Sequence, residues 1–317
     1  MFLKILERLF GRRRKESDIN AFEENNLAPN RRGRGLKLNI VLFVVTCLTT
    51  FGTAFLISGG SVTAGLWFSA GIITILFSHE MGHYLMCRKY GVRATLPYFI
   101  PFPPLINPFN LASSIWLNPF GTMGAVIRME GRMQNRRVLF DIGAGGPLAG
   151  LVPTLLALFW GLMMSTPEVH SAETPQATLI LGKSLVFELF AAMAGKSFEF
   201  ATLESLHPLA FAGWAGLFIT ALNLFPVGQL DGGHVLYALM GEKSNKVYPV
   251  LASVFILIAL SLYPGWIPLI LLLMFFRIEH PPTLQTVTPL DPVRKALAVF
   301  LFVVFIFSFT PMPFLMY

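Results

Sequence analysis

The chain has 317 residues, of which 54% are hydrophobic and only 13% are charged, about half the charged fraction of an average soluble domain. Its apolar residues gather in blocks of about 20, the length of a membrane-spanning helix, so a soluble globular protein is excluded and an all-α polytopic membrane protein is predicted. The net charge is +7, but ten of the 24 Lys and Arg lie in residues 1–37, which indicates a tail near anionic lipid rather than a nucleic-acid-binding surface.

Two domains are expected, a basic cytoplasmic tail of residues 1–37 and a membrane-embedded domain of residues 38–317. Residues 1–15 have helical apolar spacing and predict either an interfacial helix or a solvated tail. Residues 247–276 are uncharged but interrupted by prolines, so they form either one kinked helix or two short ones. We therefore expect six or seven transmembrane helices. The other spans are predicted at residues 38–58, 64–87, 142–164, 209–238 and 296–316.

Two segments fit neither a span nor an ordinary loop. Residues 96–127 carry no charge but six prolines, which forbid a regular helix. We expect a re-entrant loop, with a surface loop as the alternative, and a short β-strand within residues 121–129. Residues 165–207 are apolar but interrupted by charged residues, which favours an interfacial helix.

Basic residues give the expected orientation. Those in the tail and near residues 88–93, 128–137 and 243–246 fall on one side if the spans alternate, and this side should be the cytoplasm. The tail contains acidic residues and few serines, unlike an organelle transit peptide. We therefore expect a multi-pass protein of a prokaryotic cell membrane, with a cytoplasmic N-terminus.

The second span carries HEMGH at residues 79–83, and Glu80 is the only formal charge between Leu38 and Cys87. His79 and His83 are four residues apart, so they share a helix face on which both imidazoles can bind one zinc ion. Glu80 is poorly placed as a further ligand but well placed to take a proton from water. Because a carboxylate in a span costs at least about 2.5 kcal/mol, a functional role is the default interpretation, with packing histidines as the alternative.

A catalytic zinc needs three protein ligands and an open position. Cys87 lies about 12 Å along the helix from the first histidine, too far to share its ion. The fourth span offers Asp231, its lone formal charge, whose burial a metal would compensate. Gly232 and Gly233 beside it would let two backbones approach closely. His234 is an alternative ligand, or a donor behind a ligand.

HEMGH in one span and NLFPVGQLDGG at residues 223–233 in a later one resemble the site-2 protease family of intramembrane zinc metalloproteases. GAGGPLAG at residues 143–150 resembles the motif that opens the family's middle core helix, and the Pro-rich segment resembles its re-entrant region. The resemblance extends from about Trp67 to Met240 and is weaker in residues 280–295. No stretch is long enough for the PDZ or nucleotide-binding domains that some members carry.

The resemblance implies a three-helix catalytic core within about residues 64–240. It further implies one Zn²⁺ per chain held by His79, His83 and Asp231, with Glu80 as general base. Asn223 would hold the substrate carbonyl, although an Asn in a span also often bonds a neighbouring helix. The implied function is that of a zinc metalloendopeptidase, which hydrolyses transmembrane or membrane-proximal segments of a membrane-protein substrate in regulated intramembrane proteolysis.

Two other functions are weighed against this one. A metal transporter would also place ionisable residues in its spans, but it has no need of Glu80 beside a ligand, and no inverted repeat is visible. A membrane scaffold would use the polar groups only to lock helices together. The lipid bilayer is an expected partner in every case, a nucleic acid is not, and self-association into a homo-oligomer is left open.

Overall fold

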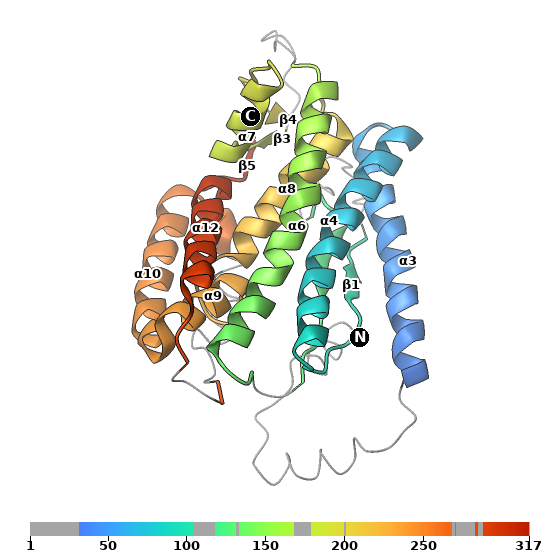
Figure 1. Cartoon of the computed structure of the whole chain (residues 1–317). Coiled ribbons are helices and arrows are strands. Elements are labelled where there is room, and N and C mark those ends of the chain that lie inside the picture. The colour runs from blue at the N-terminus through green and yellow to red at the C-terminus, as the bar shows by residue number, and fades with distance from the viewer. Residues whose placement is uncertain are drawn as a thin grey trace.

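The structure is a computed structural model, and it is mostly helical (Figure 1). Of the predicted N-terminal tail, residues 1–31 lie outside the described part of the chain. The described residues are 32–103, 118–130, 133–167, 179–199, 201–267, 270, 283–284 and 288–316.

Three long helices, α3 (Arg32–Ile57), α4 (Val62–Lys89) and α6 (Arg136–Met164), occupy the first three predicted spans. A further helical segment consists of three consecutive elements, α9 (Asp231–Met240), η2 (Gly241–Lys243) and α10 (Ser244–Leu262). The predicted number of six or seven spans is not confirmed. Within the described residues, four segments are long and apolar enough to cross a membrane: Gly35–Ile57, Val62–Lys89, Arg136–Met164 and Asp231–Leu262.

The centre of the molecule is a bundle of α4, α6 and α8 (Pro208–Asn223), each of which packs against the other two. These three helices lie within residues 64–240, where the catalytic core is predicted, and its catalytic role stays a prediction. Glycines line these contacts: a Cβ on Gly82 of α4 would overlap the backbone of Gly145 in α6, and one on Gly213 of α8 would overlap α6 at Leu158. Small residues let membrane helices approach closely, because packing rather than hydrophobic burial holds such helices together.

The fourth predicted span, residues 209–238, is wrong as a single helix, because α8 ends at Asn223 and α9 begins at Asp231. Pro226 has no N–H, and its ring would clash with the carbonyl group four residues before it. Gly228 adopts a φ of +63°, which favours glycine. A Cβ on Gly232 would overlap the Leu224 carbonyl group. The connection therefore folds tightly against the end of α8 and turns the chain into a new helix.

The stretch 247–276 is not one continuous helix. α10 ends at Leu262, Tyr263 is extended, and the short η3 (Pro264–Trp266) follows. Most of residues 268–276 lie outside the described part of the chain.

The last span, predicted at residues 296–316, is also too long. α12 (Pro292–Ser308) stops early because Pro311 and Pro313 cannot continue a helix. The chain instead forms β5 (Phe314–Met316), which pairs with β3 (Leu179–Leu181) from the middle of the sequence.

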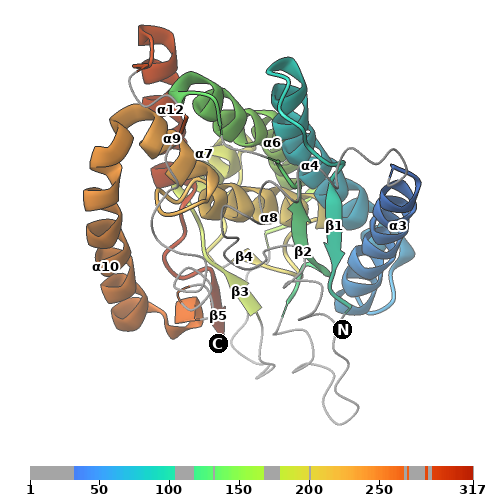
Figure 2. The same cartoon turned by 90° about the horizontal axis from the view of Figure 1, so that it is seen from below.

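The predicted strand at residues 121–129 is confirmed as β2 (Thr122–Val126). It pairs antiparallel with β1 (Tyr98–Pro101), and the hairpin lies beside α3 and α4 (Figure 2). Asn39 of α3 donates two hydrogen bonds to backbone carbonyl groups just before β1, each 2.8 Å long. The predicted re-entrant loop is not confirmed, since residues 104–117 lie outside the described part of the chain.

A small three-stranded sheet, which the sequence did not predict, lies with α7 (Leu185–Met193) at one end of the bundle (Figure 1). Its central strand is β3, between β5 and the two-residue β4 (Ala201–Thr202). α7 supplies a helix within residues 165–207, where we expected one. Its place at a membrane surface stays a prediction.

Candidate metal centre

His79 and His83 lie one turn apart on α4, and both are buried. Their Nε2 atoms are 3.1 Å apart, and the two rings are inclined at 73° to each other. The four-residue spacing on a regular helix explains this arrangement. Both imidazoles therefore direct one nitrogen to the same point inside the bundle.

Asp231 comes to this point from the other side. It is the first residue of α9, and its Oδ2 atom lies 3.2 Å from Nε2 of His79 and 3.3 Å from Nε2 of His83. The break after α8 makes this approach possible, because a continuous helix would have carried Asp231 past the histidines. Only 14% of its side chain is exposed.

These three side chains fit zinc. Metal–ligand bonds of about 2.0–2.2 Å at tetrahedral angles place ligand atoms about 3.3 Å apart, close to the three separations above. Two imidazole nitrogens and a carboxylate oxygen are also ligands that zinc accepts. In the part of the chain that the structure describes, His79, His83 and Asp231 form the group of metal-binding side chains whose ligand atoms all lie within 4.8 Å of one another.

A backbone group fixes the proton of His83. Its Nδ1 atom lies 2.7 Å from the carbonyl oxygen of Ile142 in α6, which can only accept a hydrogen bond. Nδ1 therefore carries the hydrogen, and Nε2 keeps its lone pair for the ion.

Glycines in α6 make room for both rings. A Cβ on Gly146 would overlap the ring of His83, and one on Gly150 would lie 3.0 Å from Cβ of His79. We did not single out these glycines as site residues. Their signal is the spacing of Gly143, Gly146 and Gly150, which places them along one face of a helix.

Asn223, the last residue of α8, faces the same small volume. Its Nδ2 atom lies 3.2 Å from Nε2 of His79. The amide is thus close enough to meet a group bound between the histidines and Asp231. Its role as a donor to a substrate carbonyl stays a prediction.

Glu80 is buried on α4 beside the two histidines. Its carboxylate interacts with the backbone N–H of Ile127, the residue that follows β2. Glu80 therefore lies between the metal centre and the β1–β2 hairpin, and its role as a base stays a prediction.

His234 is not part of the three-residue group. It lies one turn beyond Asp231, and a Cβ on Gly143 of α6 would come within 2.8 Å of its Cβ atom. Cys87 packs with Val138 and Ile142 in a buried apolar cluster.

Comparisons with known proteins point to the same chemistry. Residues 67–262 match the model of Peptidase family M50. "Probable zinc metalloprotease EGY1, chloroplastic" from Arabidopsis thaliana is 29% identical over 255 residues, which are 79% of this chain and 43% of that protein. "Probable zinc metalloprotease EGY2, chloroplastic" from Oryza sativa subsp. indica is 30% identical over 208 residues, 66% of this chain and 34% of that protein.

This chain thus spans less than half the length of these relatives. No solved structure matches it. The relatives are named as chloroplastic, so the predicted prokaryotic cell membrane is not confirmed.

The family match covers more than half of the 317 residues. It includes both histidines, Glu80, Asn223 and Asp231. The chain therefore belongs to peptidase family M50.

Proposed function

We propose that this protein is an intramembrane zinc metalloprotease that hydrolyses peptide bonds in or beside transmembrane segments of a membrane-protein substrate. The observation that carries the proposal is the meeting of His79, His83 and Asp231 from two helices at distances that suit one zinc ion. The names of its relatives as zinc metalloproteases support the same chemistry.

The side chains around the centre suit peptide hydrolysis. Zinc, when bound, supplies Lewis-acid chemistry that polarises a carbonyl group and acidifies water. Glu80 accepts the proton of the attacking water and passes it to the leaving nitrogen. The Asn223 amide donates to the substrate carbonyl oxygen as negative charge develops there. Burial of the site in the bundle strengthens these interactions.

The hairpin offers a way to hold the substrate. A helical substrate hides its carbonyl groups in its own hydrogen bonds, so it must open before attack. One edge of β2 pairs with β1, and among the described residues no strand pairs with the other edge. An opened substrate could add to this free edge near Glu80 by strand pairing.

We expect Ala125→Pro in β2 to lower cleavage at least tenfold, because proline removes a backbone N–H and disturbs the strand. Zinc content should stay that of the wild type. Cleavage of a transmembrane substrate by the purified variant measures the effect, and an unchanged rate would argue against strand pairing.

The cellular setting is proposed from charge. The C-terminal end of α4 and the N-terminal ends of α6 and α12 lie at one end of the molecule (Figure 1). Arg88, Lys89 and Arg136 belong to these helix ends. We propose that this end faces the cytoplasm or its equivalent and that cleavage serves regulated proteolysis.

The decisive experiment is Glu80→Gln. This change keeps the size of the side chain but removes the base, so cleavage should fall by about 10²–10⁴-fold while zinc remains bound. Glu188→Gln is the matched control. Glu188 of α7 forms an ion pair with Lys183, and both side chains are partly exposed. Cleavage at the wild-type rate by Glu80→Gln would contradict the proposal, as would zinc transport into vesicles without any proteolysis.

A further inference from the structure

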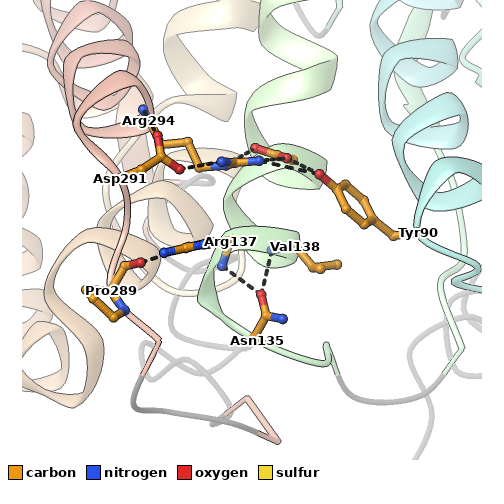
Figure 3. Close-up of polar contacts among 8 residues, drawn as sticks. Tyr90, Asn135, Arg137, Val138, Pro289, Asp291 and Arg294 are labelled. Carbon is orange, nitrogen blue, oxygen red and sulfur yellow. Dashed lines mark hydrogen bonds and ion pairs between the residues drawn. The ribbon is translucent and has the colours of Figure 1, made fainter.

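A second polar cluster joins three helices at the end of the bundle where α4 ends and α6 and α12 begin (Figure 3). It consists of Tyr90, Asp141, Asp291 and Arg294. None of these side chains belongs to the metal centre or to the steps proposed above.

Arg294 of α12 grips Asp141 of α6 with two nitrogens. Nε donates to Oδ1 over 2.7 Å, and Nη2 donates to Oδ2 over 2.5 Å. Only 14% of the Asp141 side chain and 26% of the Arg294 side chain are exposed. A bidentate, partly buried pair of this kind fixes orientation as well as distance, which an exposed single contact does not.

The remaining members complete the cluster. The Tyr90 hydroxyl, just past the end of α4, donates to Oδ2 of Asp141. Asp291, before the first turn of α12, accepts from Nη1 of Arg294 and from the Arg294 backbone N–H. The cluster therefore ties α12 to α6 and to α4 at one place (Figure 3).

The same turn of α6 also contacts the metal centre. Asp141 directly precedes Ile142, whose carbonyl oxygen accepts a hydrogen bond from Nδ1 of His83. A rotation or slide of α6 that released Asp141 would move this carbonyl group, since both lie on one turn of a rigid helix.

α12 also packs on the second element that carries a ligand. Ala298 and Leu301 of α12, together with Leu290 just before the helix, form one buried cluster with residues of α6 and with Val235 of α9. Asp231 is the first residue of α9. The helix that Arg294 anchors thus supports both sides of the centre.

We infer that the Asp141–Arg294 pair positions the metal centre by holding α6 so that the Ile142 carbonyl group keeps His83 in its zinc-binding tautomer. Both are positioning residues, because they act through Ile142 and not on the substrate. The inference rests on the proposed function, since it concerns the zinc ligands of that site.

Arg294→Gln tests this inference. The change removes the positive charge and the paired hydrogen bonds to Asp141 but keeps a polar side chain. We expect zinc affinity, measured by competition with a chelator, to fall about tenfold, as it does when a group that orients a ligand is lost. Tyr90→Phe removes one hydroxyl group and should lower zinc affinity about two- to threefold. This variant tests the inference if Arg294→Gln does not fold.

Lys196→Met is the control for a purely structural role. Lys196 donates to the carbonyl oxygen of Met163 over 2.6 Å and to that of Ser165, so it secures the opposite end of α6. Its loss should lower the thermal midpoint but leave zinc affinity within about twofold of the wild type. Equal loss of affinity in Lys196→Met and Arg294→Gln, or no loss in either, would overturn the inference.

A readout without metal separates this inference from the proposed function. ¹⁵N NMR of the metal-free protein should show His83 protonated at Nδ1 in the wild type and a mixture of tautomers in Arg294→Gln or Tyr90→Phe. An unchanged His83 signal in the folded variants overturns the positioning role. Failure of the wild type to bind zinc would instead overturn the proposed function.

Discussion

At the metal centre α4 and α6 meet through glycines, whereas α8 meets the strands and the C-terminal segments through a cluster of aromatic rings. Trp214 and Phe218 of α8 stack with centroids 5.6 Å apart, and Phe314 of β5 lies 5.5 Å from Trp214. Trp214 also donates its Nε1–H to the Gly182 carbonyl oxygen over 2.7 Å. Phe120, just before β2, extends the cluster.

The glycine contacts and the aromatic cluster have different roles in the fold. The glycine contacts bring backbones close and set the distances between ligands, so even one added carbon displaces a functional group. The aromatic cluster fills volume and contributes stability, with each ring pair worth about 0.5–1.5 kcal/mol. We therefore expect substitutions in the first region to alter zinc binding and those in the second to alter stability.

The largest contrast should come from Gly146→Ala. The added Cβ overlaps the His83 ring, which must leave its place, so zinc affinity should fall by about 100-fold or more. Gly52→Ala in α3 is the matched control, because a Cβ there meets nothing within 4 Å.

Zinc titration of both purified glycine variants makes the measurement. Gly52→Ala should bind zinc like the wild type, and alanine should not weaken either helix, since it is the better helix former. Equal zinc affinity in the two variants would show that close packing does not set the ligand geometry.

A smaller effect on function but a clear effect on stability is expected from Trp214→Leu. Trp214 is buried, and its replacement removes ring contacts and the hydrogen bond to Gly182, at a cost of about 3 kcal/mol. Zinc affinity of the folded variant should stay within about twofold of the wild type. Thermal unfolding in detergent measures the stability, and zinc titration measures the affinity. A parallel loss of zinc affinity would show that the two regions do not have separate roles.

Local patterns predicted much of this arrangement. The first three spans and the shared face of His79 and His83 follow from hydropathy and helical periodicity alone. Asp231 is predicted as a ligand because it is the lone formal charge in its apolar stretch, and the structure places it beside the two histidines. The strand at β2 was predicted, but its partner β1 was not, because pairing depends on a contact between distant segments.

The misses have physical causes. The apolar run of residues 209–238 predicts one span, but Pro226 and the tight contact between Gly232 and Leu224 end α8 at Asn223. The span predicted at residues 296–316 includes β5 because the residues of β5 are apolar, and its pairing with β3 has no local signature in the sequence. The Ile142 carbonyl group is a backbone acceptor, and a backbone acceptor leaves no mark in the sequence.

The central claim is that side chains from α4 and α9 together hold one zinc ion. The most direct test is the zinc content of the purified wild type beside Asp231→Ala after dialysis against a weak chelator. We expect about one zinc ion per chain in the wild type and almost none in the variant, because two histidines alone hold zinc too weakly. Equal zinc content in the two proteins would contradict the claim.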